Sequence, residues 1–165
     1  MIVVDTNVVA YCYIRFERTQ VAQRVRLREP AWHVPILWRS ELRSALAGYI
    51  GRGTMQVDEA AGIMMAAETA LDGCEHAVAS RAVLEIAASS GLSACDCEFV
   101  ALAQSLGVPL VTEDRVVLKA FPEVALSMED FLESFPDVPP RAHEKRGRYR
   151  VSKRRGARKP QTLRG

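Results

Sequence analysis

Apolar residues along the chain follow two alternating patterns: short continuous runs, and longer segments with apolar residues three or four positions apart. The runs predict buried strands, which we place at 1–4, 32–34, 76–79, 108–111 and 124–126. The longer segments predict helices, which we place at 10–27, 36–50, 58–70, 81–89, 96–106, 115–120 and 128–133. Short strands that alternate with helices are typical of an α/β fold with a central parallel sheet.

This pattern stops after residue 135, where prolines at 136, 139 and 140 open a segment with almost no large apolar side chains. Residues 136–165 hold eleven Lys and Arg against two acids, a net charge of +9, whereas residues 1–135 hold eleven against eighteen, a net charge of −7. A segment of this composition buries too little apolar surface to offset the entropy lost on ordering it. We therefore predict a folded acidic domain over 1–135 and a disordered basic tail over 136–165.

Length and composition narrow the class of protein. The 165 residues suit one domain, and 48% hydrophobic with 25% charged residues is typical of a globular chain. No apolar run approaches the roughly eighteen residues that a membrane span needs, and the N-terminus has no basic region like that of a signal peptide. We expect a cytoplasmic protein whose four cysteines are reduced.

Two acidic residues directly follow predicted strands. Asp5 comes directly after the first strand, and Asp114 follows Leu110, Val111 and Thr112 at the end of the fourth. Open parallel sheets place functional groups at the carboxyl ends of their strands, so both acids are candidates for a site there. Each also has a purely structural interpretation, as the N-cap of the helix that follows it.

Two further carboxylates belong to apolar helix faces. Glu41 borders the apolar stripe that includes Trp38 and Leu42, where an unpaired charge is costly, so it needs an arginine or a metal ion as partner. Asp96 precedes the apolar face of its helix, but the sequence from Ser93 to Asp96 also matches a capping box. Asp96 alone therefore fits a helix cap as well as a metal ligand.

Four carboxylates in one small domain would repel one another unless a cation shared their site. An all-oxygen donor set suits Mg²⁺ or Mn²⁺, whereas the cysteines and histidines lack the spacing of zinc ligands. The sequence also contains no Walker-type phosphate loop and no nucleophile elbow. The chemistry that remains is metal-assisted reaction at a phosphoryl group.

The four segments that carry these acids resemble the PIN domain, and most closely that of VapC-type toxins of type II toxin–antitoxin systems. The segments are VDTNV at 4–8, RSEL at 39–42, SACDCEFVALA at 93–103 and LVTED at 110–114. They occur in the order and at the spacings usual for the family. The resemblance extends from the N-terminus to about residue 134 and leaves the basic tail outside it.

The resemblance implies a three-layer α/β/α sandwich around a central parallel sheet and a Mg²⁺- or Mn²⁺-dependent endoribonuclease. The metal-binding and catalytic acids of the family are matched by Asp5, Glu41, Asp96 and Asp114. Polar residues that would position water or the scissile phosphate are matched by Thr6, Asn7 and Thr112. Thr6 and Asn7 could equally serve to begin the helix after the first strand.

Partners also follow from the resemblance. VapC-type toxins act on RNA, commonly dimerise and are held inactive by a cognate antitoxin, so we expect an RNA substrate, a homodimer and an antitoxin. The apolar stretch at 60–67 offers Ile63, Met64 and Met65 as contact residues, although packing in the core is the simpler use for them.

Other functions are open at this stage. A haloacid-dehalogenase-like phosphatase fits poorly, because its Asp-x-Asp motif corresponds to Asp5 and Asn7 here and a suitable lysine is missing unless Lys119 serves. A catalytically idle PIN-like domain that binds RNA or protein is not excluded by the sequence. The basic tail has three interpretations: an RNA-gripping arm in which Tyr149 stacks on a base, a solvated extension without a role, or a segment that folds back onto the acidic domain.

Overall fold

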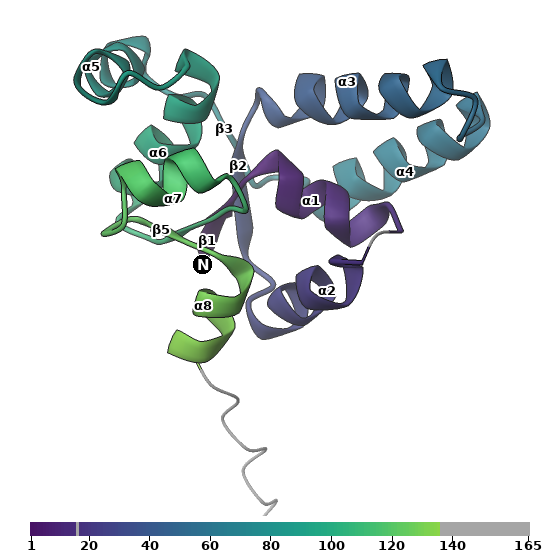
Figure 1. Cartoon of the computed structure of the whole chain (residues 1–165), viewed down its shortest axis with the longest axis horizontal. Coiled ribbons are helices and arrows are strands. Elements are labelled where there is room, and N and C mark those ends of the chain that lie inside the picture. Colours follow the sequence, from purple (N-terminus) through teal and green to yellow (C-terminus); the bar gives the residue numbers. More distant parts are fainter. Residues whose placement is uncertain (16, 136–165) are drawn as a thin grey trace, which may run out of the picture.

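The computed structural model describes residues 1–15 and 17–135, which form five strands and eight helices (Figure 1). In chain order the elements are β1 (Ile2–Val4), α1 (Thr6–Tyr13), α2 (Thr19–Arg28), β2 (Trp32–Pro35), α3 (Trp38–Gly51), α4 (Val57–Ala70), β3 (Glu75–His76), α5 (Ser80–Ser90), α6 (Ala94–Leu106), β4 (Leu110–Val111), α7 (Arg115–Ala120), β5 (Ala125–Leu126) and α8 (Met128–Ser134). The alternation of strands and helices in the sequence is thus retained in the fold.

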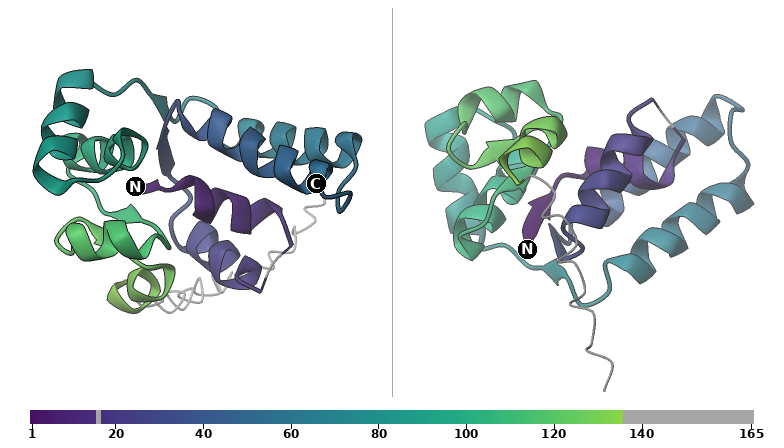
Figure 2. Two further views of the ribbon diagram at one scale, coloured as in Figure 1. Left: turned by 45° about the horizontal axis from the view of Figure 1, so that its top comes forward. Right: turned by 90° about the horizontal axis from the view of Figure 1, so that it is seen from below.

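The strands form one parallel sheet in the order β3-β2-β1-β4-β5. Figures 1 and 2 show α5, α6 and α7 on one side of this sheet and α1, α2, α3 and α4 on the other, while α8 packs against α2 and β5. The predicted α/β/α sandwich is confirmed. The long helices α3 and α4 form an antiparallel hairpin that extends away from the sheet (Figure 2).

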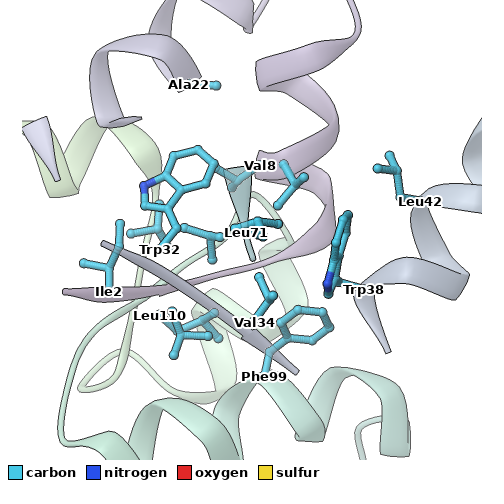
Figure 3. Close-up of a cluster of buried hydrophobic side chains, with 14 of the residues drawn as sticks. Ile2, Val8, Ala22, Trp32, Val34, Trp38, Leu42, Leu71, Phe99 and Leu110 are labelled. Atoms are coloured by element: carbon cyan, nitrogen blue, oxygen red, sulfur yellow. The ribbon is translucent and has the colours of Figure 1, made fainter. Parts of the chain in front are cut away.

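The core lies on both faces of the sheet, as expected for strands whose residues are apolar throughout. All three residues of β1 are buried, and the two tryptophans are the largest side chains that are fully enclosed. Figure 3 shows Trp32 beside Val8 and Ala22, from the helices of one layer, while Phe99 approaches the strands from α6 in the other. Burial on both faces fixes the position of β1, whose end carries the first candidate carboxylate.

The prediction of one helix over 10–27 is wrong. Asp5 caps α1, which therefore starts at Thr6, and the backbone turns to an extended conformation at Ile14 before α2 begins at Thr19. The break lets Ile14 bury its side chain, and the Thr19 hydroxyl donates a hydrogen bond to the Ile14 carbonyl at 3.0 Å. Local periodicity could not locate this turn, because both flanking segments have helical composition.

The other boundaries differ from the predicted ones by a few residues. The third strand is Glu75–His76 rather than 76–79, because the chain has left the sheet by Ala79, which is the N-cap of α5. Gly91 and Gly107 end α5 and α6 with φ of 73° and 64°, a left-handed conformation that glycine adopts without steric cost. The predicted tail at 136–165 lies outside the described residues.

A membrane span is not found in any single helix of the described residues. Only α5 and α6 taken together have the required length and composition, and they are bent by 113° where they meet. Six of the thirteen residues of α6 are buried in the core, which accounts for its apolar composition.

Candidate active site

Asp5 and Asp114 lie where the strand order of the sheet reverses. The chain runs from β1 to β2 and β3 on one side, and β4 and β5 lie on the other side of β1. Parallel sheets hold their functional groups at the carboxyl ends of the strands beside such a reversal. The backbone N–H of Asp5 donates to the carbonyl of Val111 at 3.0 Å, which holds the ends of β1 and β4 side by side.

Both carboxylates also cap the helices that follow them. Asp5 is the N-cap of α1 and accepts a hydrogen bond from the backbone N–H of Asn7 at 3.4 Å. Asp114 is the N-cap of α7, and its Oδ1 accepts from the N–H groups of Val116 at 2.7 Å and Val117 at 3.3 Å. The structural interpretation of both residues therefore holds. The capping hydrogen bonds orient both carboxylates. They leave room for a catalytic role, since the cap of α7 uses only one oxygen of Asp114.

A buried hydroxyl joins the two strand ends. Thr112 is fully buried, and its Oγ1 donates to Oδ2 of Asp5 at 2.5 Å and accepts from the N–H of Asp114 at 3.0 Å. The Asn7 side chain donates to the same Asp5 oxygen at 2.8 Å, and its Oδ1 accepts from the N–H of Glu113 at 3.3 Å. Thr112 and Asn7 therefore fix the Asp5 carboxylate relative to the loop after β4. In the structure they position the Asp5 carboxylate, whereas the sequence analysis expected them to position water or the scissile phosphate.

Glu41 has a partner of a different kind from the two that its sequence position indicated. It lies on α3, next to the buried Leu42, and its Oε2 accepts a hydrogen bond from the Thr6 hydroxyl at 2.5 Å. Neither arginine nor metal is needed to satisfy this oxygen. Arg39, on the same helix, binds Glu75 and Glu68 and not Glu41.

Asp96 lies in the first turn of α6 and makes the capping box that the sequence predicted. Its backbone N–H donates to Oγ of Ser93 at 3.1 Å, and the Ser93 hydroxyl donates to Oδ2 of Asp96 at 2.7 Å. All the hydrogen bonds that hold this carboxylate are therefore local to one helix end. The carboxylate itself lies close enough to Glu41 for their charges to interact.

Electrostatic repulsion links the carboxylates from different elements. Burial raises the pKa of Asp5 to about 6, the hydrogen bond from Thr112 opposes this, and the charges of Glu41 and Asp114 add to it. Burial also raises the pKa of Glu41, the hydrogen bond from Thr6 opposes this, and the negative charge of Asp96 adds to it. The four predicted acids thus form a continuous series of interacting charges.

Glu98 is a fifth acid at this site, and the sequence did not single it out. Its charge raises the pKa of Glu41 and that of the Cys95 thiol, whose pKa is raised first by partial burial. Residues two positions apart on a helix normally point to different sides, so spacing from Asp96 gave no signal for Glu98. Only the approach of α3 to α6 brings Glu98 and Glu41 together.

The contacts of Glu113, which the sequence did not indicate, hold the loop after β4. Glu113 forms an ion pair with Arg18, and Arg18 also contacts Glu129 at 2.8 Å. The backbone N–H of Met128 donates to Glu113 at 2.9 Å. Glu113 thereby ties the segment between Thr112 and Asp114 to α2 and α8.

The chemistry of the donor set fits a hard divalent cation, since every candidate ligand is a carboxylate oxygen. Within residues 1–15 and 17–135, no three His, Cys, Asp or Glu side chains are arranged to coordinate one ion. The carboxylates are turned instead toward Thr6, Ser93, Thr112 and the helix N-termini. Two histidines that the sequence left scattered, His33 and His76, do meet, with Nδ1 and Nε2 at 2.7 Å, but on β2 and β3.

Comparisons with known proteins bear on the family and the fold of the chain. The family model described as PIN domain matches residues 2–124. Ribonuclease VapC3 of Pyrobaculum aerophilum is 28% identical over 124 residues, which cover 73% of this chain and 95% of the relative. The crystal structure of PAE2754, also from Pyrobaculum aerophilum, superposes with a TM-score of 0.63 at 23% identity and covers 81% of this chain and 95% of that one. That likeness bears on the fold alone, and it agrees with the predicted three-layer sandwich.

Proposed function

Because the chain belongs to the PIN domain family, we propose that it is a metal-dependent endoribonuclease and the toxin of a type II toxin–antitoxin pair. The relative named Ribonuclease VapC3, which the chain matches over 95% of that protein's length, supports a ribonuclease activity of this kind. The expected divalent ion is Mg²⁺ or Mn²⁺, and the expected partners are an RNA substrate, a cognate antitoxin and a second copy of the chain.

The observation that carries the proposal is the series of electrostatic interactions that links carboxylates from four separate segments, of which Asp5 and Asp114 lie at the carboxyl ends of β1 and β4. Asp5 interacts electrostatically with Glu41 and Asp114, and Glu41 interacts with Asp96. Repelling charges destabilise a fold, and a protein tolerates them where function requires them. A purely structural role as helix caps explains Asp96 and Asp114, but it does not explain Glu41.

The residues proposed to hold the divalent ion are Asp5, Glu41, Asp96 and Asp114. When bound, the ion would polarise a phosphate and favour deprotonation of water for in-line attack at phosphorus. The chain supplies the positions of its ligands: Thr112 and Asn7 hold Asp5, and Thr6 holds Glu41. Glu41, whose pKa is raised first by burial, is the residue proposed to accept a proton from water, and Asp114 is the alternative base.

Protein partners are proposed to use the exposed part of α4. Ile63 and Met64 are half-buried and pack against the core, in line with the simpler use considered for them. Met65, in contrast, is 66% exposed. Met65 is therefore the residue of this group that we assign to a contact with an antitoxin or a second copy.

The test is cleavage of mixed cellular RNA by the purified full chain, freed of any bound antitoxin, with Mg²⁺, Mn²⁺ or EDTA. Asp5→Asn and Asp96→Asn are the site variants, and Asp72→Asn is the matched control because Asp72 is an exposed acid in the turn after α4. We expect discrete products that need the metal, that both site variants abolish and that the control retains.

Cleavage that survives both site substitutions would come from a contaminant and would overturn the catalytic assignment. If no RNA is cut, the melting temperature with and without the ion decides between two remaining cases. A rise in melting temperature that the ion causes and Asp5→Asn removes would show that the ion binds at the site, because ligands that bind only the folded state stabilise it. The lack of cleavage would then mean that the mixture did not contain the substrate RNA. No rise would favour the idle PIN-like domain.

A further inference from the structure

Two histidines on neighbouring strands form a contact that the proposed function does not use. Nδ1 of His33 on β2 lies 2.7 Å from Nε2 of His76 on β3, and the ring centroids are 5.0 Å apart. At these separations the two nitrogens lie between the rings, so one ring donates its N–H to the other. Both side chains are half-buried, and each is carried on a strand of the sheet.

A hydrogen bond between two imidazoles holds one proton between the facing nitrogens. The bond forms when both rings are neutral or when one of them is charged, because the accepting nitrogen must keep its lone pair. Once both rings are protonated, two N–H groups face each other and two positive charges repel. The pair therefore accepts a first proton with its contact intact and loses the contact when it takes up a second.

The surroundings of His33 oppose this second charge. Burial is the largest cause that lowers the pKa of His33, and the charges of His76 and of the Met1 amino group lower it further. Glu29 acts in the opposite direction, but its carboxylate binds the Met1 amino group at 2.5 Å. The second proton is therefore taken up only below the ordinary histidine pKa of about 6.5.

His76 lies on a short edge strand. β3 has two residues and pairs with β2 alone. The backbone hydrogen bonds between the two segments include those from the N–H of Val34 to the carbonyl of Cys74 at 3.1 Å and from the N–H of Ile36 to the carbonyl of His76 at 3.0 Å. A contact between side chains is thus a substantial part of what holds β3 to the sheet.

Glu75, the other residue of β3, ties this strand to the first turn of α3. Its Oε1 accepts from Nε1 of Trp38 at 2.6 Å, and its two oxygens bind Arg39 at 2.5 and 2.9 Å. Trp38 is fully buried, so its indole N–H depends on this partner. Glu41 lies one turn further along the same helix. A change in the position of β3 therefore affects the helix that carries one of the carboxylates.

We propose that His33 and His76 form a pH-sensitive latch, which holds β3 to β2 while they carry at most one added proton and releases β3 and the first turn of α3 when a second proton binds. The inference concerns the fold and is independent of the proposed function. The folded pair binds fewer protons than the same histidines in the unfolded chain. Its contribution to stability is therefore present above about pH 6.5 and is lost as the pH falls.

A local measurement is needed, because burial raises the pKa of Asp5 to about 6 and this group acts on stability in the opposite direction over the same pH range. The experiment follows hydrogen exchange of single amides by NMR in the full chain, in EDTA, between about pH 7.5 and about pH 5. Exchange reports the local opening of hydrogen bonds, and it is expressed as a protection factor relative to an unfolded amide at the same pH. The probes are the N–H groups of Val34 and Ile36, and the internal controls are those of Leu110 and Thr112, which donate to the carbonyls of Val124 and Leu126 at the other edge of the sheet.

We expect protection at Val34 and Ile36 to fall at least tenfold between about pH 7 and about pH 5, whereas protection at Leu110 and Thr112 should not fall. The matched variant is the double substitution His33→Asn and His76→Gln. Its amides hydrogen-bond in place of Nδ1 and Nε2 but do not titrate, so the fall with pH should disappear.

An equal fall at both edges of the sheet would overturn the proposal, because it would mean that the whole domain opens. A fall that persists in the double variant would overturn it as well, since other groups would then cause it. If the double variant does not fold, titration of the imidazole signals in the natural chain decides. Two separate steps, the second below the ordinary pKa, would support the latch, and two rings that each titrate near pH 6.5 would reject it.

Discussion

The carboxylates of the site fall into two pairs that are held in different ways. Asp5 and Asp114, the strand-end pair, are joined through the buried Thr112 hydroxyl, and Asp5 and Thr112 are 107 positions apart in the chain. Glu41 and Asp96, the helix pair, are each held by one hydroxyl, that of Thr6 and that of Ser93. The strand-end pair cannot shift without disturbing β1 and β4, whereas each member of the helix pair can turn on its own.

The two pairs therefore differ in how burial and local hydrogen bonds affect their charges. The strand-end pair carries the cost of burial, since burial is the largest cause of the raised pKa of Asp5. The helix pair combines a raised pKa at Glu41 with a local cap at Asp96. Substitution should therefore affect stability most at the strand ends and least at the helix N-terminus.

The largest expected effect is the pH dependence of stability caused by Asp5 in the metal-free protein. Its pKa is raised from 3.8 to about 6 in the folded state, so the folded state holds a proton that the unfolded state has lost. Stability then falls as pH rises from about 4 to about 6, by roughly 3 kcal/mol in total from this group. Asp5→Asn lacks this pH dependence. As pH rises from about 4 to about 6, the free energy of unfolding of the variant should therefore increase relative to that of the natural chain, by up to roughly 3 kcal/mol.

Denaturant unfolding in EDTA at pH 4, 5, 6 and 7 measures the gain. The exposed Asp72→Asn serves as control and should show a constant difference from the natural chain. A difference for Asp5→Asn that does not change with pH would show that Asp5 is solvated rather than buried.

The second effect concerns the hydroxyl that joins the strand ends. Thr112→Val leaves the Asp114 N–H and the Asp5 carboxylate without this partner, which we expect to cost about 1–3 kcal/mol and to raise the pKa of Asp5 further. RNA cleavage should fall at least tenfold. Thr112→Ser keeps the hydroxyl, so it should retain most of the stability in unfolding assays and most of the RNA cleavage. Equal behaviour of the two variants would mean that packing, not hydrogen bonding, is what Thr112 supplies.

A smaller effect is expected at the ion pair that ties the loop after β4 to α2. The Arg18 side chain is 36% exposed, and exposed ion pairs contribute at most about 1 kcal/mol. Arg18→Gln should lower stability by about 0.5–1 kcal/mol in low salt and by less in about 0.5 M salt, where charges are screened. Arg24→Gln, on an exposed position of α2, should leave stability unchanged. Loss of the same size at both salt concentrations would argue against an ionic origin.

The smallest effect on stability is expected at Asp96. The side-chain oxygen of Asn can accept the same hydrogen bond from Ser93, so Asp96→Asn should change the unfolding free energy by less than about 0.5 kcal/mol. Its RNA cleavage should nevertheless be lost. A folded, stable and inactive Asp96→Asn would show that a member of the helix pair serves activity without contributing much to stability. A large loss of stability would show that the two pairs do not differ in this respect.

The sequence predicted the fold well because strand and helix patterns are local. The runs at 1–4 and 108–111 are apolar enough to indicate buried strands, and Asp5 and Asp114 follow from where these runs end. The break between α1 and α2 was missed because it depends on burying Ile14 in a core formed by other elements.

The contacts of the site were less predictable than its members. Nothing near Glu41 in the sequence indicates Thr6 as its partner, because α1 and α3 meet only in the folded chain. The role of Glu113 between Arg18 and the N-terminus of α8 has the same origin. Side chains that act across elements need the tertiary structure, whereas caps such as Ser93 can be read from a four-residue motif.

The central position of β1 has a consequence for how the protein is made. Of the five strands of this domain, β1 is synthesised before the others, yet it lies in the middle of the sheet, and one of its two neighbours, β4, comes more than a hundred residues later. Contacts of such high sequence separation close long loops and form late in folding. A nascent chain therefore holds Asp5 without Thr112 or Asp114 until nearly the whole domain has left the ribosome. For the proposed nuclease, this order of assembly keeps the unfinished chain inactive among the RNAs that surround its synthesis.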